Sequence, residues 1–161
     1  MTDYFSLANQ PTERFVSLYG FFAIHYPKYW KQETDVNGQY VFFNEQGGSG
    51  VARIIVFDNE FEGADASKKV LESFYIQHKD FTPLLLAAGN NRFVHFVKEH
   101  EVNGAVFTIY YWAAAKGDKV LLITYTVQTS MKDMDTAVAE KQDMEMMIAS
   151  LVFLHENTAN G

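Results

Sequence analysis

The chain has 161 residues, of which 48% are hydrophobic, 20 are Asp or Glu and 13 are Lys or Arg. This hydrophobic share excludes a disordered chain, and the length fits a single domain. The formal net charge of −7 argues against nucleic-acid binding, which needs clustered Lys and Arg. The absence of cysteine excludes a disulfide scaffold, an iron–sulfur cluster, a cysteine-ligated zinc site and a thiol nucleophile.

The N-terminal residues show no targeting pattern. They lack the basic stretch and apolar stretch of a secretory signal, and no apolar run in the chain approaches ~18 residues. We therefore expect a cytoplasmic protein with no membrane partner. We expect one domain over residues 1–161, with a folded core over 11–154, a flexible start over 1–10 and a flexible tail over 155–161.

The first third of the chain predicts three strands joined by short links. Pro11 is expected to begin a short helical turn through Phe15, because proline tolerates the first position of a helix. Aromatic and β-branched residues then alternate up to Pro27, and an Asn37-Gly38 turn marks a hairpin. The expected strands cover residues 18–26, 39–43 and 51–57. Because the links are short, we expect antiparallel pairing.

The rest of the chain predicts two helices and a meander. Asp65 is a suitable N-cap for the first helix, and Asn103-Gly104 suits a type I′ turn between two long strands. The expected helices cover residues 66–79 and 133–149, and the expected strands cover 93–102, 105–115 and 119–129. Two segments stay open: residues 84–88 form a strand or a loop, and residues 150–154 extend the helix or form a short strand.

An apolar stripe is expected along the last helix. Its members recur at helical spacing and should face the sheet. They are Met134, Ala137, Val138, Met144, Met147, Ile148 and Leu151. Met146 falls off this stripe and is expected to be exposed.

This element order predicts the fold class. Runs of antiparallel strands with interposed helices are typical of α+β proteins and not of a doubly wound parallel sheet. We expect a six- or seven-stranded antiparallel sheet with helices packed on its faces. The long strands are apolar on both sides, which favours a sheet covered on both faces.

Residues 20–30, with the sequence GFFAIHYPKYW, resemble the opening of proteins with the Mog1/PsbP-like fold. Later parts agree: a strand ends in Val102-Asn103-Gly104, a Lys-Gly-Asp turn follows, and the last helix runs into the sequence IASLVF. The similarity spans about residues 19–154 and is greatest to the small bacterial domains of this group. It implies an antiparallel sheet between helices and a binding or accessory role. Mog1 proteins bind a small GTPase and PsbP proteins assist photosystem II, but no motif here transfers either role.

Four patterns in the sequence are candidates for a chemical site, and none of them predicts catalytic, cofactor-binding or metal-binding residues. The glycine loop of residues 47–50 lacks the Lys-Ser/Thr and helix of a phosphate cradle, so a flexible hairpin loop is favoured. His95, Glu99 and Glu101 share one strand face and could hold a cation, but a strand running into solvent is the favoured interpretation. The acidic residues of segment 58–65 favour helix capping. No pair of carboxylates suggests acid–base catalysis.

Aromatic residues form two clusters that are candidates for an interaction surface, because Tyr and Trp join an apolar body to a polar handle. The candidates are Tyr29, Trp30, Tyr110, Tyr111 and Trp112. The alternative is that these rings close the edges of the core of a small sheet.

Three functional hypotheses follow. The first is a non-enzymatic interaction or accessory module with an unidentified protein partner. The second is a small-ligand-binding protein or enzyme with a polar pocket around His95, Glu99, Tyr111 and Arg53. The third is a homodimer formed through an exposed strand edge.

Overall fold

The computed structural model describes residues 11–154, and within them the chain forms ten strands and two α-helices. The strands are β1 (Thr12–Val16), β2 (Phe22–Pro27), β3 (Lys31–Thr34), β4 (Tyr40–Phe43), β5 (Gly50–Asp58), β6 (Leu84–Ala88), β7 (Asn91–Val102), β8 (Ala105–Lys116), β9 (Lys119–Gln128) and β10 (Val152–Phe153). The helices are α2 (Ala66–Gln77) and α3 (Asp135–Ala149), with 3-10 turns η1 (Leu18–Gly20), η2 (Lys79–Phe81) and η3 (Thr129–Met131). The predictions for residues 1–10 and 155–161 lie outside the described residues.

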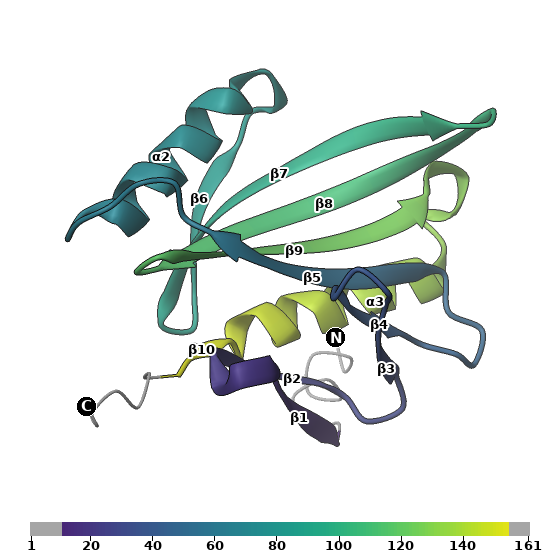
Figure 1. The fold of residues 1–161 in the computed structure, drawn as a ribbon. Helices are drawn as coiled ribbons and strands as arrows, with labels where there is room; N and C mark the ends of the chain where they lie inside the picture. The colour runs from purple at the N-terminus through teal and green to yellow at the C-terminus, as the bar shows by residue number, and fades with distance from the viewer. Residues whose placement is uncertain (1–10, 155–161) are drawn as a thin grey trace.

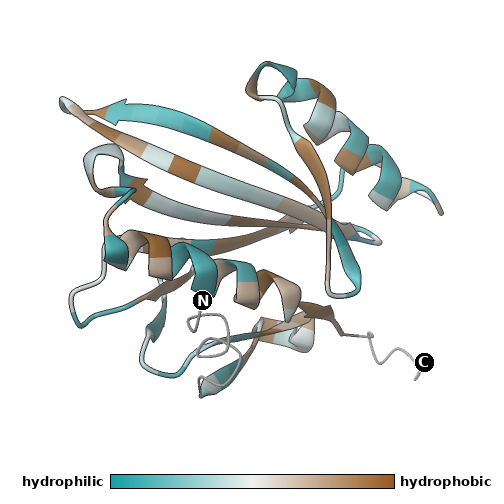
Figure 2. Cartoon of the chain, turned by 180° about the vertical axis from the view of Figure 1, so that it is seen from behind, coloured by the Kyte–Doolittle hydropathy of each residue, from teal (hydrophilic) through white to brown (hydrophobic). Residues whose placement is uncertain are grey.

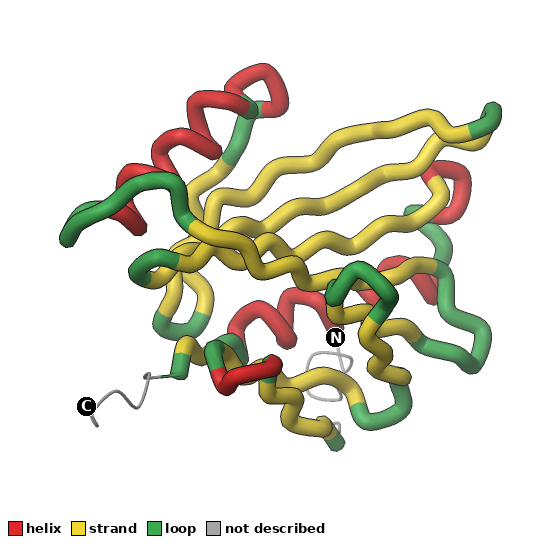
Figure 3. Tube along the Cα trace, viewed as in Figure 1, coloured by secondary structure: helices red, strands yellow, loops and turns green. Residues whose placement is uncertain are grey.

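Seven strands form one twisted antiparallel sheet in the order β3-β4-β5-β9-β8-β7-β6 (Figure 1, Figure 3). A second, three-stranded antiparallel sheet has the order β1-β2-β10. The chain is therefore α+β with an antiparallel seven-stranded sheet, as the sequence predicts. The turn between β7 and β8 has positive φ at Asn103 (52°) and Gly104 (86°), as a type I′ turn requires.

Helix α3 lies between the two sheets, where it contacts β2 as well as β5 and β9 (Figure 1). Side chains from α3 and from the facing sides of the two sheets form a single apolar core. Its largest fully buried members include Tyr125, Phe22, Phe42, Phe93, Ile123, Met144 and Met147. This side of the large sheet, which we call the α3 side, holds the core, and only toward the β7–β8 turn do its Val97 and Val106 remain exposed.

Helix α2 lies on the opposite side of the large sheet, which we call the α2 side, and contacts β7 and β8. Its His78 ring stacks on Phe96 of β7 with 4.0 Å between ring centroids. Away from the helix, sheet residues such as Val51 and Ile55 remain half-exposed. Both faces thus carry a helix, but the cover is least complete on the α2 side, because one twelve-residue helix is too short to span seven strands.

Two expectations for the start of the described chain are wrong. Residues 12–16 form strand β1 instead of a helical turn, because they pair along their whole length with β2. The strand expected over 18–26 begins only at Phe22, because Tyr19 (φ 66°) and Gly20 (φ 65°) turn the chain first. Strand β3 was not foreseen, since its sequence KQET carries no apolar alternation. Pairing with neighbouring strands overrides weak local preference in these segments.

The helices differ from prediction in their polar residues. Asp65 holds the N-cap position of α2 without a side-chain cap bond. On α3, Met134 (51% exposed) and Val138 (45% exposed) face solvent, whereas Glu140 and Asp143 are buried in the stripe that faces the sheet. The open segments resolve as strand β6 and, at residues 152–153, as strand β10. Within residues 11–154, neither helix is long and apolar enough to cross a membrane.

Candidate functional site

The five aromatic residues predicted to form an interaction surface do not share one. Trp30 (5% exposed) and Trp112 (3% exposed) are buried in the core, so no partner can contact them directly. Tyr110 faces α3, where the Lys141 ammonium lies 5.0 Å from its ring centroid. Tyr111 lies on the α2 side and is half-buried. Of the five residues, only Tyr29 is exposed. The alternative interpretation, rings that close the core, describes the two tryptophans.

The residues of the alternative polar pocket are split between the two sides of the sheet. His95 pairs with Trp112 in the β7–β8 register and stacks on its ring at 4.8 Å, on the α3 side. Tyr111 and Arg53 project from the other side, so no pocket can contain all four residues. Burial lowers the pKa of His95, against the opposing effect of its 2.7 Å hydrogen bond to the Tyr111 carbonyl oxygen. His95 is therefore a half-buried side chain held by ring stacking and by a backbone hydrogen bond.

Glu140 is buried on α3, and both of its carboxylate oxygens accept hydrogen bonds. Its Oε1 accepts hydrogen bonds from the Tyr125 hydroxyl (2.7 Å) and the Gly50 amide (2.8 Å). Its Oε2 accepts one from the Ser49 amide (2.8 Å). Burial and the bond to Glu140 raise the pKa of Tyr125. The carboxylate thus fastens the glycine loop between β4 and β5 to α3, so this loop is bound to the core.

Asp143 lies one turn further along α3 and is less well satisfied. The Tyr29 hydroxyl donates a 2.7 Å hydrogen bond to its Oδ2. Its Oδ1 and the indole Nε1 of Trp30 are buried without a hydrogen-bond partner among the described residues. Burial raises the pKa of Asp143, while the bond from Tyr29 acts in the opposite direction. Perturbed carboxyls can mark reactive sites, but Asp143 lines neither of the two cavities described below.

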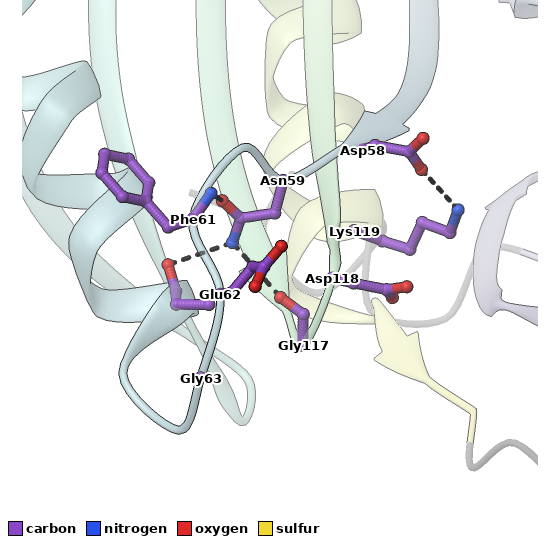
Figure 4. Close-up of a pocket in the computed structure, with 9 residues that line it drawn as sticks. Asp58, Asn59, Phe61, Glu62, Gly63, Gly117, Asp118 and Lys119 are labelled. Carbon is purple, nitrogen blue, oxygen red and sulfur yellow. Dashed lines mark hydrogen bonds and ion pairs between the residues drawn. The ribbon is translucent and has the colours of Figure 1, made fainter.

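A polar pocket of about 550 Å³ lies between the loop after β5 and the β8–β9 turn (Figure 4). Asn59 joins these two loops, since its amide nitrogen donates to the carbonyl oxygens of Ala66 (3.0 Å) and Gly117 (3.2 Å). Asp58 forms a 2.6 Å ion pair with Lys119. No group of three His, Asp or Glu residues in the described chain is placed to hold a metal ion. The residues that line this pocket therefore hold the loop after β5 and the β8–β9 turn together.

The larger cavity is a groove of about 1050 Å³ between α2 and the hairpin of β6 and β7. One wall is the helix surface that carries Leu71, Tyr75 and Ile76. The floor is β6, which Figure 2 shows as a hydrophobic strand beside the helix. Leu85 is 70% exposed and Ile76 is 66% exposed. We call this cavity the α2–β6 groove.

The α2–β6 groove is lined by more basic than acidic residues, whereas the whole chain has more acidic than basic residues. Lys68, Arg92 and Lys116 line it, with Glu72 as the single acidic residue. None of the three cations forms an ion pair within residues 11–154. The chain as a whole carries more acidic than basic residues. The groove can therefore accommodate an apolar segment with negative charge beside it.

Sequence reasoning missed this groove. The available signal was the run Leu84-Leu85-Leu86-Ala87-Ala88, which is apolar on both strand faces and ends at a Gly89-Asn90 turn. A run of this kind predicts a strand with two covered faces. Nothing in the run shows that it forms the edge of the sheet, where two of its leucines remain exposed.

Comparison with known proteins places the chain among domains of the same architecture. A family model described as "Domain of unknown function (DUF3805)" matches residues 10–160. A search of the curated proteins found no match. A crystal structure from Bacteroides thetaiotaomicron is 21% identical with a TM-score of 0.72 over 90% of this chain. The chain spans about half of that structure, 49% of its length.

Two further structures are similar in fold. LpqN of Mycobacterium tuberculosis, described as involved in cell envelope biogenesis, is 12% identical with a TM-score of 0.60, covering 96% of this chain and 97% of LpqN. Cyanobacterial PsbP (CyanoP) from Synechocystis sp. PCC 6803 is 9% identical with a TM-score of 0.45, covering 89% of this chain and 92% of CyanoP. The family match and the likeness to LpqN confirm the predicted resemblance to small domains of this α+β fold. At these identities the likeness concerns the fold alone.

Proposed function

The chain belongs to the family described as a domain of unknown function (DUF3805), and we propose from its structure that it is a non-enzymatic binding module. In this proposal, the α2–β6 groove holds an apolar segment of a partner protein. The observation that carries the proposal is the exposure of Leu85 and Ile76, which line the same large cavity. The proposed setting is the bacterial cytoplasm, as the sequence predicts.

The exposed apolar surface of the groove supports a binding role. Water contact with apolar surface costs about 25 cal/mol per Å², so contiguous exposure of large apolar side chains marks an interaction site more often than a single exposed leucine does. Tyr75, which is 37% exposed on the groove wall, adds an aromatic side chain of the type that dominates binding energy at interfaces.

The engagement of the reactive side chains elsewhere supports the non-enzymatic part of the proposal. The Glu140 carboxylate accepts three hydrogen bonds, and His95 is stacked against Trp112. Asn59 is bonded to two loops. The groove itself offers lysine, arginine and one glutamate over an apolar floor, which suits recognition more than acid–base chemistry.

Site-specific crosslinking in the native host tests the proposal. A photoreactive phenylalanine replaces Tyr75 in the groove or, as the control, Tyr19, which is 96% exposed on η1. We expect a discrete adduct from position 75 that position 19 does not give. The adduct should disappear when Leu85→Asp is added and persist with Val36→Asp, at a 99% exposed position in the β3–β4 turn. Equal adducts from both positions would contradict a binding role for the groove.

A further inference from the structure

We propose that the partner segment is an extended acidic peptide that adds as an extra strand to the free edge of β6. This inference rests on the proposed function and narrows it to one mode of binding and one chemistry of partner. The structural basis is the juxtaposition of an unpaired apolar edge strand, a helix wall and three cations at the α2–β6 groove.

Strand β6 ends the large sheet and pairs only with β7 within the described residues. Proteins usually protect an edge strand with charged residues, a bulge or a covering element, because its free amides and carbonyls attract other strands. The five residues of β6 are Leu84, Leu85, Leu86, Ala87 and Ala88, with no charge among them. Leu84 (56% exposed) and Leu85 (70% exposed) are open to solvent, and β6 has no backbone hydrogen bond to any described element other than β7.

The register of the β6–β7 hairpin determines which backbone groups face the free edge. Gly89 and Asn90 form a two-residue turn, and the flanking pair Ala88 and Asn91 is therefore the hydrogen-bonded kind. Bonded and non-bonded pairs alternate along an antiparallel ladder. Consequently Leu85 and Ala87 direct their amides and carbonyls away from β7, toward the open edge.

Leu85 and Ala87 also project their side chains into the α2–β6 groove. An added strand would bond to their backbone groups and would place every second side chain against α2, because side chains alternate along a strand. The helix wall there is apolar at Leu71, Tyr75 and Ile76. This is the geometry of β-strand addition, in which backbone bonds give affinity and a side pocket gives sequence preference.

The charge of the groove selects an acidic peptide. Lys68, Arg92 and Lys116 line the groove into which one face of the added strand would project, and they have no ion-pair partners in residues 11–154. Carboxylates on the peptide would meet these cations, and complementary charge speeds association and rejects wrong partners. The fitting ligand therefore carries both apolar and acidic side chains on the strand face that meets α2, over about five residues, the length of β6.

A second copy of this chain fits the groove less well. Pairing of β6 with β6 of another copy would bring a strand without any acidic residue, and it would add a second set of the same cations. Each copy also carries a formal net charge of −7, which opposes association. The cations remain unmatched in this arrangement, so we assign the edge to a separate acidic segment.

The test uses the full chain and a fluorescent nine-residue peptide in which valine and glutamate alternate at the odd positions and threonine occupies every even position, so that one strand face carries both apolar and acidic side chains. We expect saturable binding by fluorescence polarisation, at least tenfold weaker when the glutamates become lysines. Two further peptides carry N-methyl groups on the odd or on the even residues. Only one of these two should lose binding, by tenfold or more, because only one set of peptide amides faces β6 in an added strand.

Matched variants localise the binding. Arg92→Glu and Leu85→Asp should each weaken peptide binding at least tenfold. Arg14→Glu, at an exposed position of β1, is the control for the charge reversal, and Val36→Asp is the control for the added carboxylate. Neither residue lines the groove, so both variants should leave binding unchanged. Analytical ultracentrifugation of the chain without peptide should show a monomer.

Each contrary result has a distinct meaning. Failure of the acidic peptide to bind, with the crosslink at position 75 intact, overturns the strand-addition inference and leaves the proposed function standing. Equal binding of both N-methylated peptides indicates docking without strand addition and also overturns the inference. A dimer that Leu85→Asp dissociates would make a second copy the occupant. Loss of the groove-specific crosslink itself would overturn the proposed function.

Discussion

The two sides of the large sheet present the same kinds of side chain in opposite conditions. On the α3 side, helix and small sheet enclose rings, methionines and even two carboxyl groups, so that Met144 and Tyr125 have no exposed surface. On the α2 side, one helix covers part of the sheet and leaves Leu85 and Ile76 in contact with solvent. Apolar residues therefore stabilise the fold on the first side and remain available for binding on the second.

The largest effect is expected from Glu140→Ala. The change leaves the Tyr125 hydroxyl and the amides of Ser49 and Gly50 buried without an acceptor, which should lower the free energy of unfolding by at least about 3 kcal/mol. Urea denaturation measures it. Glu145→Ala, at an exposed position whose 3.7 Å contact with Lys141 is a surface ion pair, is the control and should cost less than about 1 kcal/mol. Equal losses would show that the α3 side is not the more tightly bonded region.

The second-largest loss of stability is expected from a substitution in the β6–β7 turn, which packs against the end of α3. Gly89 has φ 59°, and a Cβ added there would overlap the carbonyl oxygen of Ala149 at the end of α3. We expect Gly89→Ala to lower the unfolding free energy by about 2–3 kcal/mol. Gly117→Ala is the control, because its φ is 60° but its Cβ meets nothing within 4 Å. It should cost only the backbone strain of about 1 kcal/mol. Similar losses would mean that the β6–β7 turn does not pack on α3.

Removal of one methyl group compares the sides directly. Ile123→Val, on the α3 side at 0% exposure, should lower the unfolding free energy by about 1 kcal/mol. Ile76→Val, in the groove, should change it by less than about 0.5 kcal/mol. Both are read from denaturant midpoints at constant slope. A larger loss at Ile76 would place the groove within the stabilising core.

The smallest effect concerns the pH dependence of stability. The pKa of Asp143 is raised in the folded chain, mainly by burial, from an ordinary value of 3.8. The folded state then binds more protons than the unfolded state above pH 3.8, so the unfolding free energy falls as pH rises toward the folded pKa. Asp143→Asn should remove this loss, and its advantage in Tm over the parent chain should grow between about pH 3.5 and 7. Asp118→Asn, an exposed control, should track the parent chain, and an advantage of Asp143→Asn that shrinks with pH would contradict the account.

The two sides were not equally predictable from the sequence. Periodicity and turn chemistry predicted the long hairpin of β7 and β8, helix α2 and most of helix α3, because these elements carry their own local signals. Strand β1 and the short β3 form because each pairs with the next strand along the chain, and no pattern within their own residues records this pairing.

The buried carboxyl groups and the groove escaped prediction for a related reason. A glutamate within an apolar helix is expected to face solvent, and Glu140 is buried only because Tyr125 and the glycine loop supply its partners. Likewise, Leu85 is exposed only because β6 ends the sheet. Both facts depend on which elements meet in space, and this information lies in the assembled fold.

Amide hydrogen exchange with and without the acidic peptide tests the central claim most directly. Without peptide, the amides of Leu85 and Ala87 should exchange rapidly, whereas that of Ile123 in the interior of the sheet should exchange slowly. On peptide binding, we predict at least tenfold slower exchange at Leu85 and Ala87, beyond any change at Ile123. Protection at Leu85 and Ala87 in the free monomer, or exchange there that the bound peptide leaves unchanged, would contradict the account of β6 as an open binding edge.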